Sequence, residues 1–230
     1  MGIRNKVRQI FYALGIPNVS NYIESNIADL KGSFIGSYAQ HGEDLFVLEY
    51  FDGRLGFYLD IGANHPIKLS STYLLYKRGW RGLTIEPIPH LARLQKSFRQ
   101  HDKNLNAAVG DASGNLKFFE IIPDFFSTFD EDRANLLVKS GSILISTYDV
   151  EVWTLKDVCL KLIPETQIDF LTVDTESFDL QVLKSNDWTN IRPKLISCEN
   201  GDSHDISSFM KSVGYKSIKQ LGCNTFFHQA

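Results

Sequence analysis

Tyr58-Leu-Asp-Ile-Gly-Ala-Asn-His-Pro-Ile67 is the stretch of this 230-residue chain that decides its fold. The apolar run over 57–61 contains the acidic Asp60 near its end, and the tight turn that follows contains Gly62. A second short apolar run, over 82–86, ends in Glu86 and is followed by a proline. The order of strand, glycine turn, helix, strand and acidic residue is typical of a site that binds a nucleotide-type cofactor.

The residues of this turn favour one kind of cofactor over another. Gly62 lets the backbone approach a ligand closely, and Glu86 can accept hydrogen bonds from ribose hydroxyls. The turn lacks the G-x-G-x-x-G pattern that binds a pyrophosphate. The sequence therefore favours S-adenosylmethionine over NAD as the ligand.

Outside this stretch, strand and helix patterns alternate along the chain. Strands are expected at 57–61, 82–86, 104–109, 168–174, 193–199, 215–220 and 223–228, and helices near 70–78, 89–100, 154–161, 177–185 and 204–212. Before the first strand, the segment 37–44 is expected to lead into a helix that runs through Tyr50 and stops at Gly53. The alternation predicts an α/β fold with a seven-stranded, mostly parallel sheet covered on both faces. The last two strands, joined at Gly222, predict an antiparallel hairpin at one sheet edge. Residues 1–36 are expected to form a helical N-terminal extension, and 37–230 the main domain.

The rhythm breaks between Gly110 and Thr147, which indicates an insertion. A turn at 111–114 is expected to lead into an extra strand at 115–122, and 123–133 is a polar, aromatic loop. Such a segment commonly closes over a binding site. Aromatic side chains in or near it are Phe118, Phe119, Phe125, Phe126, Phe129 and Trp153. Some belong to the core, while the 125–129 cluster is suited to stacking on adenine or on a sugar face.

Composition bounds the class of protein. Hydrophobic residues at 43% and charged residues at 22% are typical of a globular domain, and a net charge of -3 gives no electrostatic argument for a nucleic-acid partner. Cys159, Cys198 and Cys223 are widely spaced and odd in number, which favours a reducing, cytoplasmic setting over a disulfide framework. No apolar run is long enough to span a bilayer. The sequence leaves the oligomeric state open.

Residues 1–14 carry three basic side chains and an apolar face with helical spacing. Two interpretations of this segment stay open. It could touch a membrane surface, or it could pack as an amphipathic helix on its own domain or on a partner.

Polar residues gather at the predicted carboxyl ends of the strands, where open α/β sheets bind their ligands. The strand ends carry Asp60, Gly62, Ala63, Asn64 and His65 (first strand), Glu86 and Pro87 (second), Ala108 and Asp111 (third), Asp174 and Glu176 (fourth), and Glu199 and His204 (fifth). Since these ends meet at one edge of the sheet, their side chains are expected to form one site.

Several of these segments resemble successive blocks of the FkbM-type methyltransferases. The blocks are Leu59-Asp-Ile-Gly-Ala-Asn-His-Pro66, Arg78-Gly-Trp-Arg-Gly-Leu-Thr-Ile-Glu-Pro87, Asn106-Ala-Ala-Val-Gly-Asp111 and Phe170-Leu-Thr-Val-Asp-Thr-Glu176, with Ser37-Tyr-Ala-Gln-His-Gly-Glu-Asp44 similar to a common lead-in. Together they span about residues 37–221. The resemblance implies a class I S-adenosylmethionine-dependent O-methyltransferase domain over 37–230, often acting on sugar hydroxyls of glycans or glycoconjugates.

The resemblance, combined with chemistry, gives expected cofactor contacts. Asp60, Gly62, Ala63 and Asn64 would line the methionine portion, and Glu86 with Pro87 would meet the ribose. Asp111, beside Ala108, is a candidate partner of the adenine amino group, although its sequence also suits a plain turn. Gln40, Glu43 and Asp44 could cover the cofactor from the N-terminal side, or their helix could use them at a solvated first turn.

Methyl transfer to a hydroxyl needs a base, because an alcohol attacks only as its proton leaves. Asp174, Glu176, Glu199 and His204 are the candidates. Alternatively, Asp174 and Glu199, with a third ligand, could hold Mg²⁺ or Mn²⁺ and orient two sugar oxygens. A helix N-cap is the purely structural role for the fourth-strand acids.

His65 either shapes the cofactor turn or acts as a base from within it. The family pattern often has Glu-Gly where this chain has Glu176-Ser177, which weakens any inherited acceptor specificity. Three alternative functions stay open: a methyltransferase of non-sugar hydroxyls, a non-catalytic nucleoside-cofactor-binding module, and a nicotinamide-dependent oxidoreductase. The acids at the fourth and fifth strands argue against the second, and the missing phosphate loop against the third.

Overall fold

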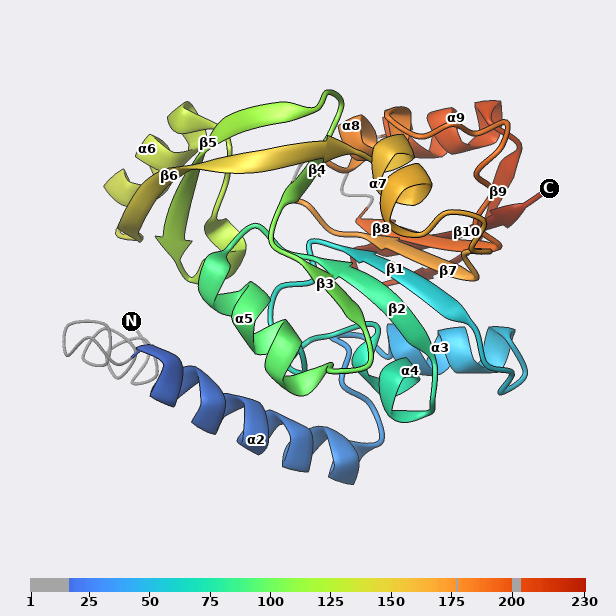
Figure 1. The fold of residues 1–230 in the computed structure, drawn as a ribbon, viewed down its shortest axis with the longest axis horizontal. Helices are drawn as coiled ribbons and strands as arrows, with labels where there is room; N and C mark the ends of the chain where they lie inside the picture. Colours follow the sequence, from blue (N-terminus) through green and yellow to red (C-terminus); the bar gives the residue numbers. More distant parts are fainter. Residues whose placement is uncertain (1–16, 177, 200–203) are drawn as a thin grey trace.

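The computed structural model of the chain describes residues 17–176, 178–199 and 204–230, and of residues 17–22, 24 and 204 it describes the backbone only. Its main sheet has seven strands in the order β3-β2-β1-β7-β8-β10-β9 (Figure 1). These strands are β1 (Phe57–Ile61), β2 (Arg81–Ile85), β3 (Lys103–Leu105), β7 (Phe170–Val173), β8 (Leu195–Glu199), β9 (Tyr215–Leu221) and β10 (Asn224–Gln229). The first five run parallel, whereas β10 is antiparallel to both β8 and β9. The predicted fold class is confirmed.

Helices cover both faces of this sheet (Figure 1). They are α2 (Pro17–Ile35), α3 (Glu43–Tyr50), α4 (Tyr73–Lys77), α5 (Pro89–Phe98), α7 (Leu155–Leu162), α8 (Asp179–Lys184) and α9 (His204–Ser212). Successive residues of a strand point to opposite faces, so Leu59 packs in the cluster that includes α7, α8 and α9, and Tyr58 in the one that includes α3 and α4. Burial on both faces explains why the parallel strands are so continuously apolar.

The insertion forms a second, three-stranded sheet in the order β4-β6-β5. Its elements are β4 (Ala108–Gly110), β5 (Gly114–Ile122), the 3-10 turn η1 (Asp124–Phe126), α6 (Glu131–Lys139) and β6 (Ile143–Thr154). The predicted single strand over 104–109 is therefore wrong. The chain leaves the main sheet at Asn106, whose Nδ2 donates to the carbonyls of Glu86 and Pro87, both at 2.9 Å.

The predicted loop over 123–133 contains η1 and the start of α6, and the long strand β6 was not expected. Asp130 caps α6, since its Oδ1 accepts from the backbone amides of Asp132 and Arg133. A core of Ile88, Leu91, Leu94, Ala108, Phe118, Val150 and Val152 fixes α5 against the second sheet. The insertion is thus a packed layer beside the carboxyl ends of the main strands.

The described part of the N-terminal extension is α2, which runs outside α5 (Figure 1). Ser25 is buried against the domain, and Gly32 lies so close to the ring of Tyr38 that a Cβ would collide with it. Lys77 donates to Asp29 on the helix at 2.9 Å. The expectation for residues 1–14 lies outside the described residues. Among the helices that are described, none is long and apolar enough to cross a bilayer.

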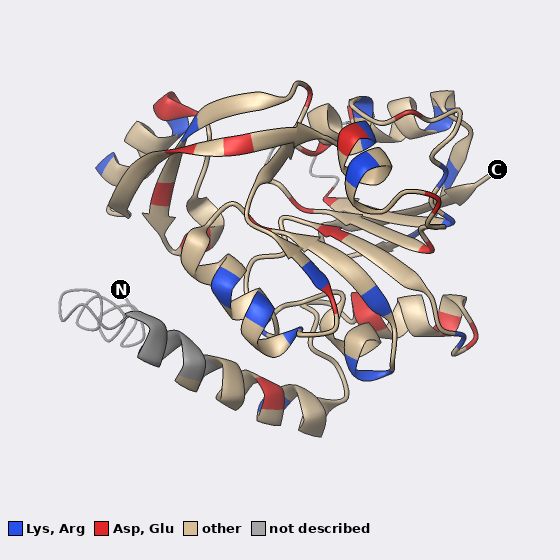
Figure 2. Cartoon of the chain, viewed as in Figure 1, with Lys and Arg blue, Asp and Glu red and all other residues tan. Residues whose placement is uncertain are grey.

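Both signs of charge are distributed over the helices and strands (Figure 2), as expected for a net charge of -3. For the candidate site, the charges that matter lie at the carboxyl ends of the main strands, because several carboxylates are close together there.

Candidate functional site

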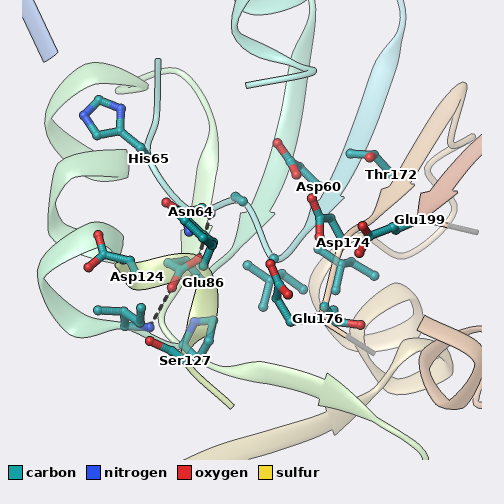
Figure 3. Close-up of a pocket in the computed structure, with 18 of the residues that line it drawn as sticks. Asp60, Asn64, His65, Glu86, Asp124, Ser127, Thr172, Asp174, Glu176 and Glu199 are labelled. Carbon is teal, nitrogen blue, oxygen red and sulfur yellow. Dashed lines mark hydrogen bonds between the residues drawn. The ribbon is translucent and has the colours of Figure 1, made fainter. Parts of the chain in front are cut away.

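A cavity of about 600 Å³ lies at the carboxyl ends of β1, β2, β7 and β8, between the main sheet and the insertion. This volume is within the ordinary range for small-molecule sites. The described lining includes one lysine, Lys68, and six carboxylates: Asp60, Glu86, Asp124, Asp174, Glu176 and Glu199. Figure 3 shows most of the acids facing one another across this space. The site is therefore strongly acidic.

The turn after β1 packs directly on the end of β7. Gly62 has φ 79° and Asn64 φ 47°, both in the left-handed region, and the amides of Gly62 and Ala63 donate to the carbonyl of Ile85. A Cβ on Gly62 would collide with the carbonyl oxygen of Asp174. This position thus needs glycine for two reasons, its φ and its close approach to the neighbouring strand.

We expect Gly62→Ala to destabilise the fold and abolish cofactor binding, because the methyl group must displace the end of β7. Gly53→Ala is the matched control, since Gly53 also has a positive φ of 68° but nothing within 4 Å of the added Cβ. Urea unfolding should show a loss of about 1–2 kcal/mol for the control and a larger loss at Gly62. Equal losses at the two positions would contradict the close-approach argument.

Asp60 is buried beneath the turn and held by a cation. Its Oδ2 accepts from the hydroxyl of Thr72 at 2.5 Å and lies 3.9 Å from Nη1 of Arg99. Arg99 is itself fully buried and also donates to the carbonyl of Pro66 and the hydroxyl of Ser70. Burial raises the pKa of Asp60, and the guanidinium acts in the opposite direction. Arg99 therefore fixes both the acid and the loop that follows the turn.

Replacing Arg99 with methionine should cost about 3–5 kcal/mol of unfolding free energy, because it leaves Asp60 and Asp102 without their buried cation. Arg93→Met, at an exposed position of α5, the helix that ends just before Arg99, is the control and should change stability by less than about 0.5 kcal/mol. Chemical denaturation of the two variants makes the comparison. A small loss of unfolding free energy in Arg99→Met would show that the buried network contributes little to stability.

Glu86 closes the other side of the turn. It is 3% exposed, its Oε2 accepts from the amide of Asn64 at 2.7 Å, and its Oε1 accepts from the amide of Ile88 at 2.8 Å (Figure 3). Burial raises the pKa of Glu86 to about 8, with smaller contributions from Asp124 and Asp60, despite the opposing amide hydrogen bonds. The two amides set the orientation of the carboxyl at the cavity wall.

Beyond Glu86 the cavity becomes apolar, between β4 and the insertion. Ile88, Ala108, Phe118 and Phe129 line it there, with Asp124 at the start of η1. Of the aromatic residues named from sequence, Phe118, Phe125 and Phe129 line the cavity, and Phe119, Phe126 and Trp153 do not.

Asp111 does not reach the cavity. Its side chain is exposed in the turn between β4 and β5, which matches the plain-turn alternative. Asp124 lines the cavity instead. No sequence pattern marks Asp124, because it lies in an insertion whose folding back toward Glu86 depends on the second sheet.

Acidic side chains also crowd the opposite end of the cavity, after β7 and β8 (Figure 3). Asp174 is open to the cavity, but the protein surrounds it on its other sides. This desolvation and the nearby Asp179 and Glu176 raise the pKa of Asp174 well above its usual range. Glu199 lies at the same end, and Asp179 behind it is 3% exposed, with burial raising its pKa to about 7.

Arg133 from α6 reaches this acidic end. Its Nη1 donates to the carbonyl of Glu176 at 3.1 Å and its Nη2 to Oε2 of the same residue at 3.2 Å. Glu176 has φ 53°, an unfavourable value for a residue with a side chain, so the two contacts help to hold this conformation. Arg133 has no local sequence signal, since it acts on this end of the cavity from a helix distant in the sequence.

His65 shapes the loop after the cofactor turn. Its Nδ1 accepts from the amides of Ile67 and Lys68, and its Nε2 lies 3.1 Å from the hydroxyl of Ser25. Both ring nitrogens are engaged, which supports the loop-shaping alternative over a base.

The N-terminal lead-in contributes Gln40 to the lining. Asp44 accepts from the amides of Tyr38 and Ala39, and Glu43 accepts from the amide of His41, so these two acids hold the lead-in loop and do not line the cavity. Both acids are buried, so the alternative of a solvated first turn does not describe them either.

Most of the residues named from sequence come together here. Gln40, Asp60, Gly62, Ala63, Asn64, Glu86, Pro87, Ala108, Asp174, Glu176 and Glu199 all line the cavity, whereas Asp111 does not. The side chain of His204 lies outside the described residues. Within the part of the chain that is described, no group of three His, Cys, Asp or Glu side chains could hold a metal ion.

Comparison with known proteins identifies the family. The model of the methyltransferase FkbM domain matches residues 60–217, which is more than half of the chain. Among solved structures, the methyltransferase FkbM from Methylobacillus flagellatus KT is similar, with a TM-score of 0.50 and 13% identity. The match covers 75% of this chain and 43% of that chain, so this chain spans less than half of its length.

A TehB-like S-adenosylmethionine-dependent methyltransferase from Corynebacterium glutamicum ATCC 13032 Kitasato is also similar, with a TM-score of 0.46, 13% identity and coverage of 89% of this chain and 97% of that one. No curated protein matches the sequence. The fold is that of the class I methyltransferases, and the chain belongs to the FkbM methyltransferase family.

Proposed function

We propose that the protein transfers a methyl group from S-adenosylmethionine to a hydroxyl of a sugar in a glycan or glycoconjugate. The observation that carries this proposal is the division of the cavity's acids into two sets. One set, with Asp60 and Glu86, surrounds the glycine turn, and the other, with Asp174, Glu176 and Glu199, follows β7 and β8. The first set suits a nucleoside cofactor and the second suits an acceptor rich in hydroxyl groups.

The residues around the turn fit S-adenosylmethionine. Glu86 is buried and oriented by two amides, and as a carboxylate it would accept from both ribose hydroxyls. Gly62 leaves no Cβ in the way at the turn. Asp60 would face the methionine portion, and Asp124 the adenine amino group among Ile88, Phe118 and Phe129.

The acceptor end supports general-base catalysis. S-adenosylmethionine, when bound, supplies an electrophilic methyl group on a positively charged sulfur. Asp174 would take the proton of the attacking hydroxyl, and its raised pKa suits a base that works near neutral pH. Glu199 and Glu176 would accept hydrogen bonds from other acceptor hydroxyls and so orient the sugar. Arg133 holds Glu176 in place for this task.

Calorimetry and an acceptor screen test the proposal. S-adenosylmethionine and its demethylated product should bind and NAD should not, because the turn offers no pyrophosphate site. Mass spectrometry should then detect a gain of one methyl group on simple glycosides. Failure of the first two ligands to bind would overturn the cofactor assignment. Repeating the screen with EDTA tests the alternative in which Asp174 and Glu199 hold Mg²⁺ or Mn²⁺.

A further inference from the structure

With a neutral acceptor bound, the negative charges at the acceptor end of the cavity would outnumber the positive charges. Asp174, Glu176 and Glu199 line this end, and Asp179 lies directly behind them. Arg133 is a cation that the described residues bring to this cluster, and it donates two hydrogen bonds to Glu176 there. Lys68 is the lysine of the lining, and it lies three residues after His65 in the sequence. Figure 3 shows His65 at the opposite end of the cavity from Glu199.

One buried carboxyl oxygen behind the lining acids adds to the uncompensated negative charge of this end. Asp179 is 3% exposed, and although backbone amides donate to its carboxyl group, its Oδ1 has no hydrogen-bond partner among the described residues. Its charged neighbours are the acids Glu199, Glu176 and Asp174. A buried carboxylate oxygen without a donor is costly, and it is costlier beside other carboxylates.

The bound cofactor would neutralise only part of the excess negative charge at this end of the cavity. Four carboxylates face the charge of Arg133 and the single positive charge of the sulfonium group of S-adenosylmethionine, which leaves two negative charges. In the free protein, protons can compensate, since the pKa values of Asp174, Glu176 and Asp179 are all raised, mainly by desolvation. A bound cation would replace these protons. A hydroxyl group donates a hydrogen bond but supplies no charge, whereas an ammonium group supplies a charge and three donors.

We propose that the acceptor is a cationic polyol, an amino sugar or a similar amino alcohol, whose ammonium group lies against Glu199 while a neighbouring hydroxyl is methylated. This inference rests on the proposed function and names the substrate class of that site. It also excludes acceptors with a carboxylate or phosphate group near the reacting hydroxyl, because like charges would meet.

Three glycosides that differ only at C6 provide the test. Methyl glucoside carries a neutral group there, its 6-amino-6-deoxy analogue a positive group, and methyl glucuronide a negative group. At pH 7 the amine is protonated. Release of S-adenosylhomocysteine should give kcat/KM for the amino glycoside about tenfold or more above that for the neutral one, with no turnover of the glucuronide. Equal use of the neutral glycoside, or turnover of the glucuronide, would overturn the proposal.

The variant Glu199→Gln separates charge from shape. It should lower the ratio of kcat/KM for the amino and neutral glycosides toward one, whereas Glu151→Gln, at an exposed position of β6, should keep the wild-type ratio. An unchanged ratio in Glu199→Gln would contradict the assigned contact.

Calorimetry distinguishes failure of this inference from failure of the proposed function. Loss of S-adenosylhomocysteine binding in the wild type would defeat the proposed function itself. If that ligand binds and none of the three glycosides is methylated, each is titrated into the complex. Absence of binding by the amino glycoside then overturns the acceptor class alone.

Discussion

Asp174→Asn should lower kcat by about 10²–10⁴-fold while leaving the affinity for S-adenosylhomocysteine within a few-fold of wild type. Asparagine keeps the shape of the side chain but cannot take a proton from the acceptor. Asp174 lies at the end of β7, beside Glu176 and Glu199, and its backbone amide stays bonded to the carbonyl of Ile61. Single-turnover methylation and calorimetry on the same preparation measure the two effects.

The pH profile offers a second readout of the same assignment. Because the pKa of Asp174 is raised, the free enzyme should gain kcat/KM as pH rises through a value well above that of an ordinary aspartate. Asp149→Asn, at an exposed position of β6, should keep the wild-type rate and profile. Near-normal turnover by Asp174→Asn would remove Asp174 as the base.

Glu86→Ala should weaken binding of both S-adenosylmethionine and S-adenosylhomocysteine by about 100-fold or more. Above its pKa of about 8, Glu86 is ionised, and two hydrogen bonds from ribose hydroxyls to this charged group contribute about 1.5–3 kcal/mol each. Their loss affects both ligands alike. The amides of Asn64 and Ile88 also lose their acceptor, which loosens the turn. Calorimetry gives the affinities. Glu120→Ala, a buried acid outside the cavity lining, controls for general loss of packing.

Glu86 should also shape the pH dependence of stability. Its pKa in the folded protein is raised to about 8, so between about pH 4.5 and 8 the folded state binds more protons than the unfolded state. The contribution of Glu86 to stability is therefore fully present below pH 4.5 and declines as pH rises to 8. Glu86→Gln lacks this titration, so its stability relative to wild type should increase from pH 5.5 to 8.5. A constant difference in urea unfolding would show that the carboxyl titrates normally.

Sequence patterns were sufficient to predict that the residues around the glycine turn lie together. Asp60 and Glu86 each stand at the end of an apolar run that could only be a buried strand, and parallel strands bring such ends to one edge. Asp111 shows the limit of this logic. It follows β4, but β4 belongs to the second sheet, so Asp111 does not share the edge with Glu86.

The insertion was harder to predict, because its elements are defined by their contacts with one another. β6 is long and half-exposed, with polar residues throughout, and pairs with both β4 and β5. Without those partners its sequence resembles a loop. The positions of Asp124 and Arg133 in the site depend on this pairing, as does the apolar end of the cavity.

The stretch from Tyr58 to Ile67 determined by itself the strand, the turn and the class of cofactor, since burial and positive φ are local demands that few sequences meet. The tertiary structure alone decided what surrounds that turn: a guanidinium beneath Asp60, Asp124 across from Glu86, and Arg133 bound to Glu176. Charges and contacts between distant segments depend on distances that only the folded chain sets. For that reason the cofactor could be inferred from ten residues, whereas the acceptor had to be inferred from the charge balance of the assembled cavity.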